Sequence, residues 1–245
     1  IFLYLLVSTY IAGFLILSVV GHVFGKPEGG YRLTARPDGC VMAGLVFVTV
    51  YAQFFSLFYK VGLLANVLFL IVCIAAGAVF RRELAERIKG LWHSVPAGRK
   101  AGLLFLFLLF AYGASRGVIH YDTGLYHAQS IRWIEEYGVV KGLGNLHCRL
   151  AYNSSAFSLS AFYSFSFLGG QSYHCVAGFM ALLLAAVCSR ITEALKRKRL
   201  LLSDIARIIG IYYLMIIFDE MISPASDYFM VLTVFYIVIH YLDLV

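Results

Sequence analysis

The sequence predicts an all-α, polytopic membrane protein with about seven spans. Of its 245 residues, 61% are hydrophobic and only 13% are charged, whereas about one quarter of the residues of a soluble domain are charged. The mean hydropathy is +0.83, and several apolar runs approach the roughly 20 residues that cross the hydrocarbon core of a bilayer. This composition argues against a soluble enzyme, a disordered segment and a nucleic-acid-binding module.

Hydropathy along the chain positions each predicted span, because a transmembrane helix needs a nearly uninterrupted apolar run. The predicted spans are residues 1–21, 41–59, 61–80, 101–118, 172–190, 204–219 and 227–245. We divide the chain into N-terminal spans, residues 1–100, and a membrane core, residues 101–245. Because the sequence opens and closes inside apolar runs, we expect a fragment of a longer protein that continues beyond residue 245.

The distribution of positive charge predicts which loops face the cytoplasm. The formal net charge is +7, and excess Lys and Arg in a polytopic protein mark its cytoplasmic loops. Residues 81–100 and 190–207 each carry six cations against two acidic residues, so both are predicted to be cytoplasmic. The loops 115–153 and 219–227 then face outward, and the serine-rich apolar stretch 154–169 becomes an outer re-entrant or interfacial helix. The alternative is that this stretch also crosses, which places one basic segment outside.

The long outer loop contains a predicted amphipathic helix over residues 124–137. Apolar residues recur in it at helical spacing, and Trp133 and Tyr137 suit the headgroup level of a membrane. The apolar positions are Leu125, Ala128, Ile131 and Ile134. The five cysteines of the chain include no Cys-x-x-Cys pair, so the sequence supports neither a disulfide framework nor a zinc knuckle.

Two aspartates of the outward loops are the candidate catalytic residues. Asp122 precedes the amphipathic helix, and Asp227 opens the last apolar run. A carboxylate at either place can take or orient the proton of an acceptor hydroxyl, or bind a metal, and ionisable groups at the edge of a span are candidates for function. The structural alternatives stay open: Asp122 as a helix N-cap, and Asp227 in a first turn behind an N-cap at Ser226.

Histidine and arginine side chains supply candidate partners for these carboxylates. His127 can orient Asp122 or bind a phosphate, or can be a hydrogen-bonded structural residue. Arg149 can hold two phosphate oxygens of a lipid headgroup, although cations near a membrane also snorkel toward headgroups. His120, Asp122 and His127 are residue types that ligate metals, but their spacing matches no metal-binding signature.

The order of these features resembles the GT-C superfamily of polytopic glycosyltransferases. The resemblance rests on an outer-loop Asp, an amphipathic helix, a short hydroxyl-rich helix before Gly169-Gly170, a long span, a basic turn and a second Asp at a Ser-Pro-x-x-Asp step. The sequence is also similar to a group of bacterial inner-membrane proteins whose outer loop reads Tyr-Asp-Thr-Gly-Leu-Tyr-His, as residues 121–127 do here. Gly-Leu-Gly-Asn-Leu-His at 142–147 and Arg149 extend this likeness, which covers residues 101–245.

The resemblance implies an enzyme that takes a sugar from a polyprenyl-phosphate donor at the outer face of the inner membrane. The sugar goes to a lipid or glycan acceptor of the cell envelope. Asp122 matches the first acidic residue, which acts on the acceptor or a divalent cation, and Asp227 matches the second. Many members carry an acidic pair at the first position, whereas Thr123 follows Asp122 here. A divalent cation, with Asp122 as its ligand, is the one cofactor that the resemblance suggests.

We therefore predict an inverting glycosyltransferase of the bacterial envelope, with Asp122 as base or metal-orienting group and Asp227 supporting it. The predicted substrate-binding residues are His127, Arg149, Tyr126, Asn145 and His147. The predicted partners are the lipid-linked sugar, its acceptor and membrane lipids, and no nucleic acid. Two alternatives remain: an envelope lipid transporter or flippase, which would carry ionisable residues near mid-membrane, and a catalytically silent membrane scaffold.

Overall fold

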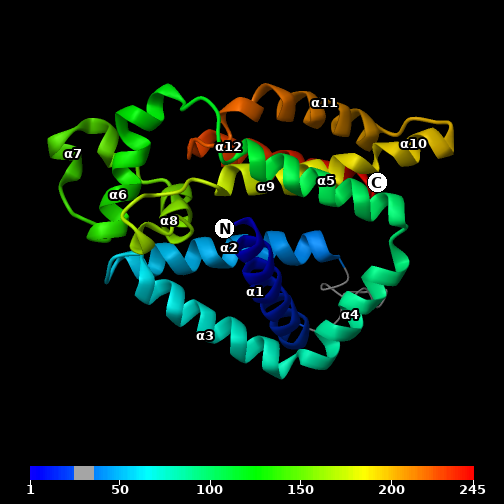
Figure 1. Ribbon diagram of the computed structural model, residues 1–245, viewed down its shortest axis with the longest axis horizontal. Coiled ribbons are helices and arrows are strands. Elements are labelled where there is room, and N and C mark those ends of the chain that lie inside the picture. The colour runs from blue at the N-terminus through cyan, green and yellow to red at the C-terminus, as the bar shows by residue number, and fades with distance from the viewer. Residues whose placement is uncertain (25–35) are drawn as a thin grey trace. The chain divides into compact units, whose positions relative to one another are not determined.

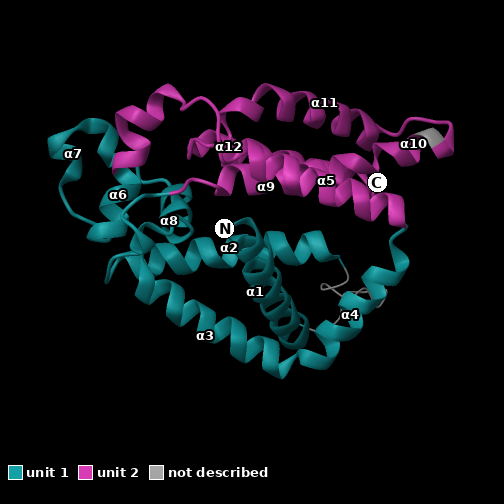
Figure 2. Ribbon diagram, viewed as in Figure 1, with its two compact units in different colours: residues 1–96, 130–172 teal, residues 97–129, 173–245 magenta. Residues whose placement is uncertain are grey.

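The computed structural model describes residues 1–24 and 36–245, and their regular structure is entirely helical (Figure 1). The all-α prediction is confirmed. The chain forms two compact units, and each is described by itself below (Figure 2). Unit 1 comprises residues 1–96 and 130–172, and unit 2 comprises residues 97–129 and 173–245. The segment 130–172 of the predicted membrane core therefore belongs with the N-terminal helices.

The prediction of seven spans is wrong. Among the described residues, three helical stretches are long and apolar enough to cross a membrane: α1 (Phe2–Val23), α2 (Pro37–Ser56) and Val176–Ala194, which begins with α9 (Val176–Cys188). A fourth is obtained if α3 (Leu63–Val79) and α4 (Arg81–Ser94), which are bent by 81°, form one span. Three to four such helices are the pattern of a multi-pass membrane protein.

The other predicted spans fail because their helices are short. α5 (Ala97–Gly113), α11 (Leu202–Ile216) and α12 (Ser226–Leu242) contain 17, 15 and 17 residues. At 1.5 Å per residue, 17 residues reach roughly 25 Å, less than the hydrocarbon thickness of about 30 Å. Hydropathy overestimated each length by one or two residues, because flanking apolar residues, such as Val118 after α5, lie in loops.

Unit 1 is built on a close crossing of α1 and α2. A Cβ on Gly13 would lie 1.7 Å from the carbonyl oxygen of Cys40, and one on Gly44 would lie 1.8 Å from that of Thr9. Small residues at a crossing let two helix backbones approach this closely. The unit is completed by α3, α4, most of α6 (Ala128–Glu136), α7 (Leu143–Leu146), η3 (Cys148–Ala151), α8 (Ser155–Phe162) and η4 (Ser166–Leu168).

The short helix α8, which covers half of the serine-rich stretch 154–169, is buried inside unit 1. Its Phe162 ring packs edge-on against Phe69 of α3 and Tyr51 of α2. The carbonyl of Phe162 accepts a hydrogen bond of 3.0 Å from Asn66 Nδ2, and Tyr163 shares one of 3.0 Å with Ser8. These two bonds tie the end of α8 to α3 and α1, whereas the buried Ser160 hydroxyl has no hydrogen-bond partner among the described residues.

Unit 2 packs α5, α11 and α12 around α9, whose residues are almost all buried (Figure 2). Its remaining elements are η2 (Thr123–His127), η5 (Ser189–Ile191), α10 (Thr192–Arg197) and η6 (Phe218–Glu220). At one end of the unit, Arg99 of α5 forms a 3.1 Å ion pair with Glu193 of α10, so residues of the two basic segments are in contact there. The loops after α5 and before α12 meet at the other end, so the charge asymmetry read from the sequence has a structural counterpart.

A buried ion network fixes the basic end of unit 2. Arg207, which is 2% exposed, lies 3.0 Å from Asp204 at the start of α11 and 2.5 Å from Asp243 at the end of α12. Arg197 reaches Asp204 at 2.6 Å. Burial alone raises the pKa of both carboxyls, but the hydrogen bonds and positive charges of these guanidiniums lower it below the usual range.

The close crossing in unit 1 gives a first test. We expect Gly13→Ala and Gly44→Ala to lower stability by about 1–3 kcal/mol, because the added methyl overlaps the facing backbone. This corresponds to a fall of roughly 3–10 °C in Tm, measured by thermal unfolding in detergent. Gly21→Ala is the matched control, because no described residue lies within 4 Å of its Cβ position. An unchanged Tm in both crossing variants would contradict the tight packing.

The ion network gives a second test. We expect Arg207→Ala to cost about 3–5 kcal/mol, because it leaves two carboxylates without their central cation. Carboxyls with a lowered pKa stabilise the folded state above about pH 4 and lose that contribution as the pH falls through their folded pKa. The acid sensitivity of the wild type should therefore weaken in Arg207→Ala. Exposed Arg199→Ala is the control, and equal pH dependence of unfolding in all three proteins would argue against the network.

Candidate functional site

Two loops of unit 2 are held together by their backbones at the end opposite the ion network. The N–H of Val118 donates a 2.7 Å hydrogen bond to the carbonyl of Asp219, and the N–H of His120 donates one of 2.7 Å to Ser223 Oγ. Gly117 permits this approach: its φ is +146°, and a Cβ there would lie 2.1 Å from the Asp219 oxygen. The segment before Asp122 is thereby tied to the segment before Asp227.

A π-helical turn, η2, decides which side chains of the Asp122 loop are buried. Thr123 and His127, at its two ends, are buried at 5% and 3% exposure, whereas Leu125 is 43% exposed. The prediction of a helix in this region is confirmed. A π turn adds a residue to the helical repeat and so shifts the register before α6 begins. Of the apolar positions of the predicted helix, Ile131 and Ile134 are buried in the protein, whereas Leu125 is exposed.

Asp122 occupies the N-cap position of η2 without acting as a cap. Among the described residues, its side chain makes no capping hydrogen bond, so the structural alternative raised by the sequence is not observed. Its own N–H donates a 3.2 Å hydrogen bond to His120 Nδ1. The carboxylate is half-buried, which leaves it accessible to a substrate.

Asp227 lies in the first turn of α12, where the helix dipole favours a negative charge. The expected N-cap at Ser226 is corrected by one residue: Ala225 is the N-cap position, and within the described chain it supplies no side-chain cap. The Asp227 side chain is exposed. Its charge is therefore neither covered by the fold nor used for capping.

His127 links the two aspartates electrostatically. Burial lowers the pKa of its imidazole, the Asp122 and Asp227 carboxylates oppose that shift, and His120 adds to it. The His120 and His127 rings are stacked with centroids 6.4 Å apart, and Tyr126 packs edge-on against His127 at 4.3 Å. A largely neutral imidazole thus lies within the field of both carboxylates, as a group able to accept or donate one hydrogen bond.

Tyr228, which lies beside His120, and its partner Glu220 were not predicted from the sequence. Tyr228, which follows Asp227, packs edge-on against His120 with centroids 6.2 Å apart. Its hydroxyl donates a hydrogen bond to the Glu220 carboxylate. The sequence shows that the 219–227 loop is acidic, with Asp219, Glu220 and Asp227. Nothing in their spacing indicates that Tyr228 contacts both Glu220 and His120.

Three predicted substrate-binding residues belong to unit 1 and lie in its segment 143–151. Asn145, His147 and Arg149 are all exposed. His147 Nδ1 accepts a 3.2 Å hydrogen bond from the N–H of Arg149 and so orders the start of η3. Their role in binding a donor stays a prediction, whereas Asp122, Tyr126, His127 and Asp227 are brought together within unit 2.

The metal suggested by the resemblance does not fit the donor set of this chain. Among residues 1–24 and 36–245, no group of three or more His, Cys, Asp or Glu side chains is arranged to hold a metal ion. Thr123, which is not acidic, follows Asp122 where the resemblance implies a second acidic residue. A carboxylate pair with a neutral histidine can orient and accept a proton without further ligands.

Comparison with known proteins assigns the chain to a family. The chain matches no curated protein and no solved structure. A family described as a domain of unknown function, DUF8201, matches residues 1–245. Because the match covers every residue, the chain belongs to the DUF8201 family.

Proposed function

We propose that this protein is a GT-C-type membrane glycosyltransferase that moves a sugar from a polyprenyl phosphate to an acceptor hydroxyl of the cell envelope. The observation that carries the proposal is the placement of Asp122 and Asp227 around the buried His127 in unit 2. The bonded loops that hold them leave both carboxylates at the surface of the unit. A transporter or flippase would instead carry its ionisable residues near mid-membrane.

The proposed reaction is a single inverting displacement. The acceptor oxygen attacks the anomeric carbon, and the bond between that carbon and the phosphate oxygen breaks. The acceptor proton passes to the Asp122 carboxylate, and the lipid phosphate leaves with the bonding electron pair. Phosphate is a good leaving group, so the reaction asks more of a base than of an acid.

The neighbouring residues position these groups. His127 donates or accepts one hydrogen bond at the phosphate or the acceptor, and its low pKa keeps it neutral near pH 7. Asp227 keeps a negative potential beside the forming oxocarbenium-like centre, which stabilises positive charge there. Tyr126 packs against His127 and limits the orientations of its ring.

The role of Asp122 is tested by Asp122→Asn in the full chain, supplied with a polyprenyl-phosphate sugar and an acceptor in proteoliposomes. We expect product formation to fall by about 100-fold or more, since the amide cannot take the acceptor proton. Asp219→Asn is the matched control, because that aspartate is exposed in the same unit and contributes only its backbone carbonyl to the loop pairing. Native turnover by Asp122→Asn, or lipid translocation without product, would contradict the proposal.

The electrostatic coupling at His127 gives a prediction that does not depend on activity. We expect the imidazole to titrate below its usual pKa of about 6.5, because burial disfavours the charged ring. In Asp122→Asn the pKa should fall further, since one carboxylate that favours the imidazolium is gone. Histidine NMR of the labelled protein, assigned with His127→Gln, measures both values. A pKa above the usual value, or one insensitive to Asp122, would show that the groups are not coupled.

A further inference from the structure

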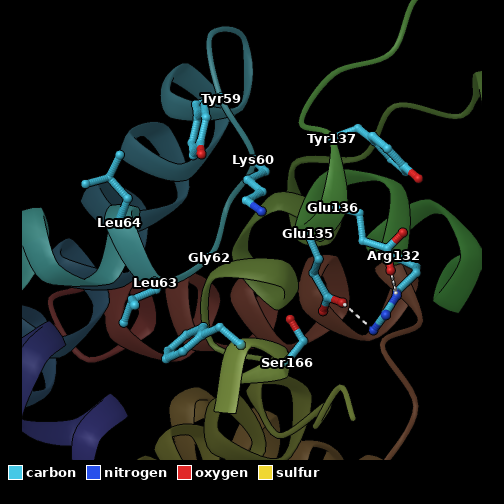
Figure 3. Close-up of a pocket in the computed structure, with 11 residues that line it drawn as sticks. Tyr59, Lys60, Gly62, Leu63, Leu64, Arg132, Glu135, Glu136, Tyr137 and Ser166 are labelled. Atoms are coloured by element: carbon cyan, nitrogen blue, oxygen red, sulfur yellow. Dashed lines mark ion pairs between the residues drawn. The ribbon is translucent and has the colours of Figure 1, made fainter. Parts of the chain in front are cut away.

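Unit 1 contains a cavity that the proposed transfer reaction does not use. Its volume is about 630 Å³, within the range of small-molecule sites in proteins. Three segments line it: the connection between α2 and α3 at 59–64, the end of α6, and η4 (Figure 3). Lys60, Arg132, Glu135 and Glu136 bring charges to it, and Tyr59, Tyr137 and Phe167 bring aromatic rings.

Backbone hydrogen bonds hold two walls of this cavity in place. The N–H of Val61 donates to the carbonyl of Ile134 at 3.0 Å, and the N–H of Val139 donates to that of Ser56 at 2.8 Å. Gly138 ends α6 with a φ of +79°, and a Cβ there would lie 2.6 Å from the Ser56 oxygen. The cavity is therefore formed before any ligand enters, which reduces the entropy cost of binding.

A buried carboxylate lies against the inner wall of the cavity. The side chain of Glu135 is 1% exposed, and its Oε2 accepts a 2.7 Å hydrogen bond from Ser172. Within the described chain, its Oε1 has no hydrogen-bond partner. A buried charged acceptor without a donor is costly, so a ligand that supplies an O–H or N–H group is favoured here.

The other charges indicate that this ligand is neutral. Arg132 lies 2.5 Å from Glu136 and 3.8 Å from Glu135 (Figure 3), and it also donates to the carbonyl of Gly170 at 2.8 Å. With Lys60, the lining carries two positive and two negative charges and so has no net charge. A phosphate or a free cation would find no excess of opposite charge, whereas a hydroxyl-rich molecule finds both acceptors and donors.

We propose that this cavity binds a neutral carbohydrate ring. Glu135 and Glu136 accept hydrogen bonds from its hydroxyls, and Lys60 and Arg132 donate to its oxygens. The aromatic residues offer apolar faces, whose negative π surface attracts the slightly positive C–H edges of a sugar ring. The inference goes beyond the proposed transfer reaction, because it rests on unit 1 alone and uses none of the residues assigned to that reaction.

The test measures sugar binding by the full chain in lipid nanodiscs, where no sugar-based detergent competes. Methyl glucoside, methyl galactoside and methyl N-acetylglucosaminide are the neutral probes, and inorganic phosphate and ethanolamine are the charged ones. Saturation-transfer NMR identifies the ligands, and calorimetry gives Kd. We expect at least one glycoside to bind, and neither charged probe to bind through Glu135.

Two cavity variants and two controls connect binding to this site. Glu135→Gln and Tyr137→Ala should each raise Kd by about 10-fold or more, because they remove a charged acceptor and an aromatic face. Tyr137 is 61% exposed, so its variant keeps the test valid if Glu135→Gln does not fold. Exposed Glu86→Gln and the transfer-site variant Asp122→Asn should leave Kd unchanged. Failure of every glycoside to bind, glycoside binding that both cavity variants leave intact, or Glu135-dependent binding of a charged probe would overturn the proposal.

Discussion

The close contact between Gly117 and the carbonyl of Asp219 is the constraint on which the candidate site of unit 2 depends. Any side chain at position 117 would occupy the space of that oxygen, and the Val118 hydrogen bond would then be lost. The two bonds of this loop pair bring Asp122 and Asp227 to one end of the unit although more than one hundred residues separate them along the chain. The absence of a Cβ at position 117 thus permits the loop pairing that brings the two carboxylates to one end of the unit.

The charged residues of unit 2 lie in two groups, one at each end of the unit. One end contains a compact network in which Arg207 joins α11 to α12, with every carboxylate bonded. The other end contains Asp122, which is half-buried, and Asp227, which is exposed. Charges that are fully compensated stabilise a fold, whereas charges left accessible are available for chemistry. Asp204 and Asp243 are therefore bound into the fold, whereas Asp122 and Asp227 are the carboxylates to which the proposal assigns chemistry.

Much of this arrangement could be predicted from sequence, and the failures have physical causes. The helical class, the grouping of cations and the two aspartates follow from composition and position. Span lengths were overestimated because hydropathy does not register where a helix stops, as after Gly113. The burial of Thr123 and His127 depends on a π turn, which has no periodic signature. Glu135 reads as a solvent-facing charge on an amphipathic helix, and only tertiary packing from η4 and the α2–α3 connection buries it.

The short helices of unit 2 also bear on how it can meet a membrane. α5, α11 and α12 contain 15 to 17 residues, and none of them is among the described helices long enough to cross a bilayer. A bilayer accommodates a short apolar helix by becoming locally thinner, at a modest cost in free energy. The thickness of a surrounding membrane therefore matters more for α5, α11 and α12 than for the longer helices α1 and α2.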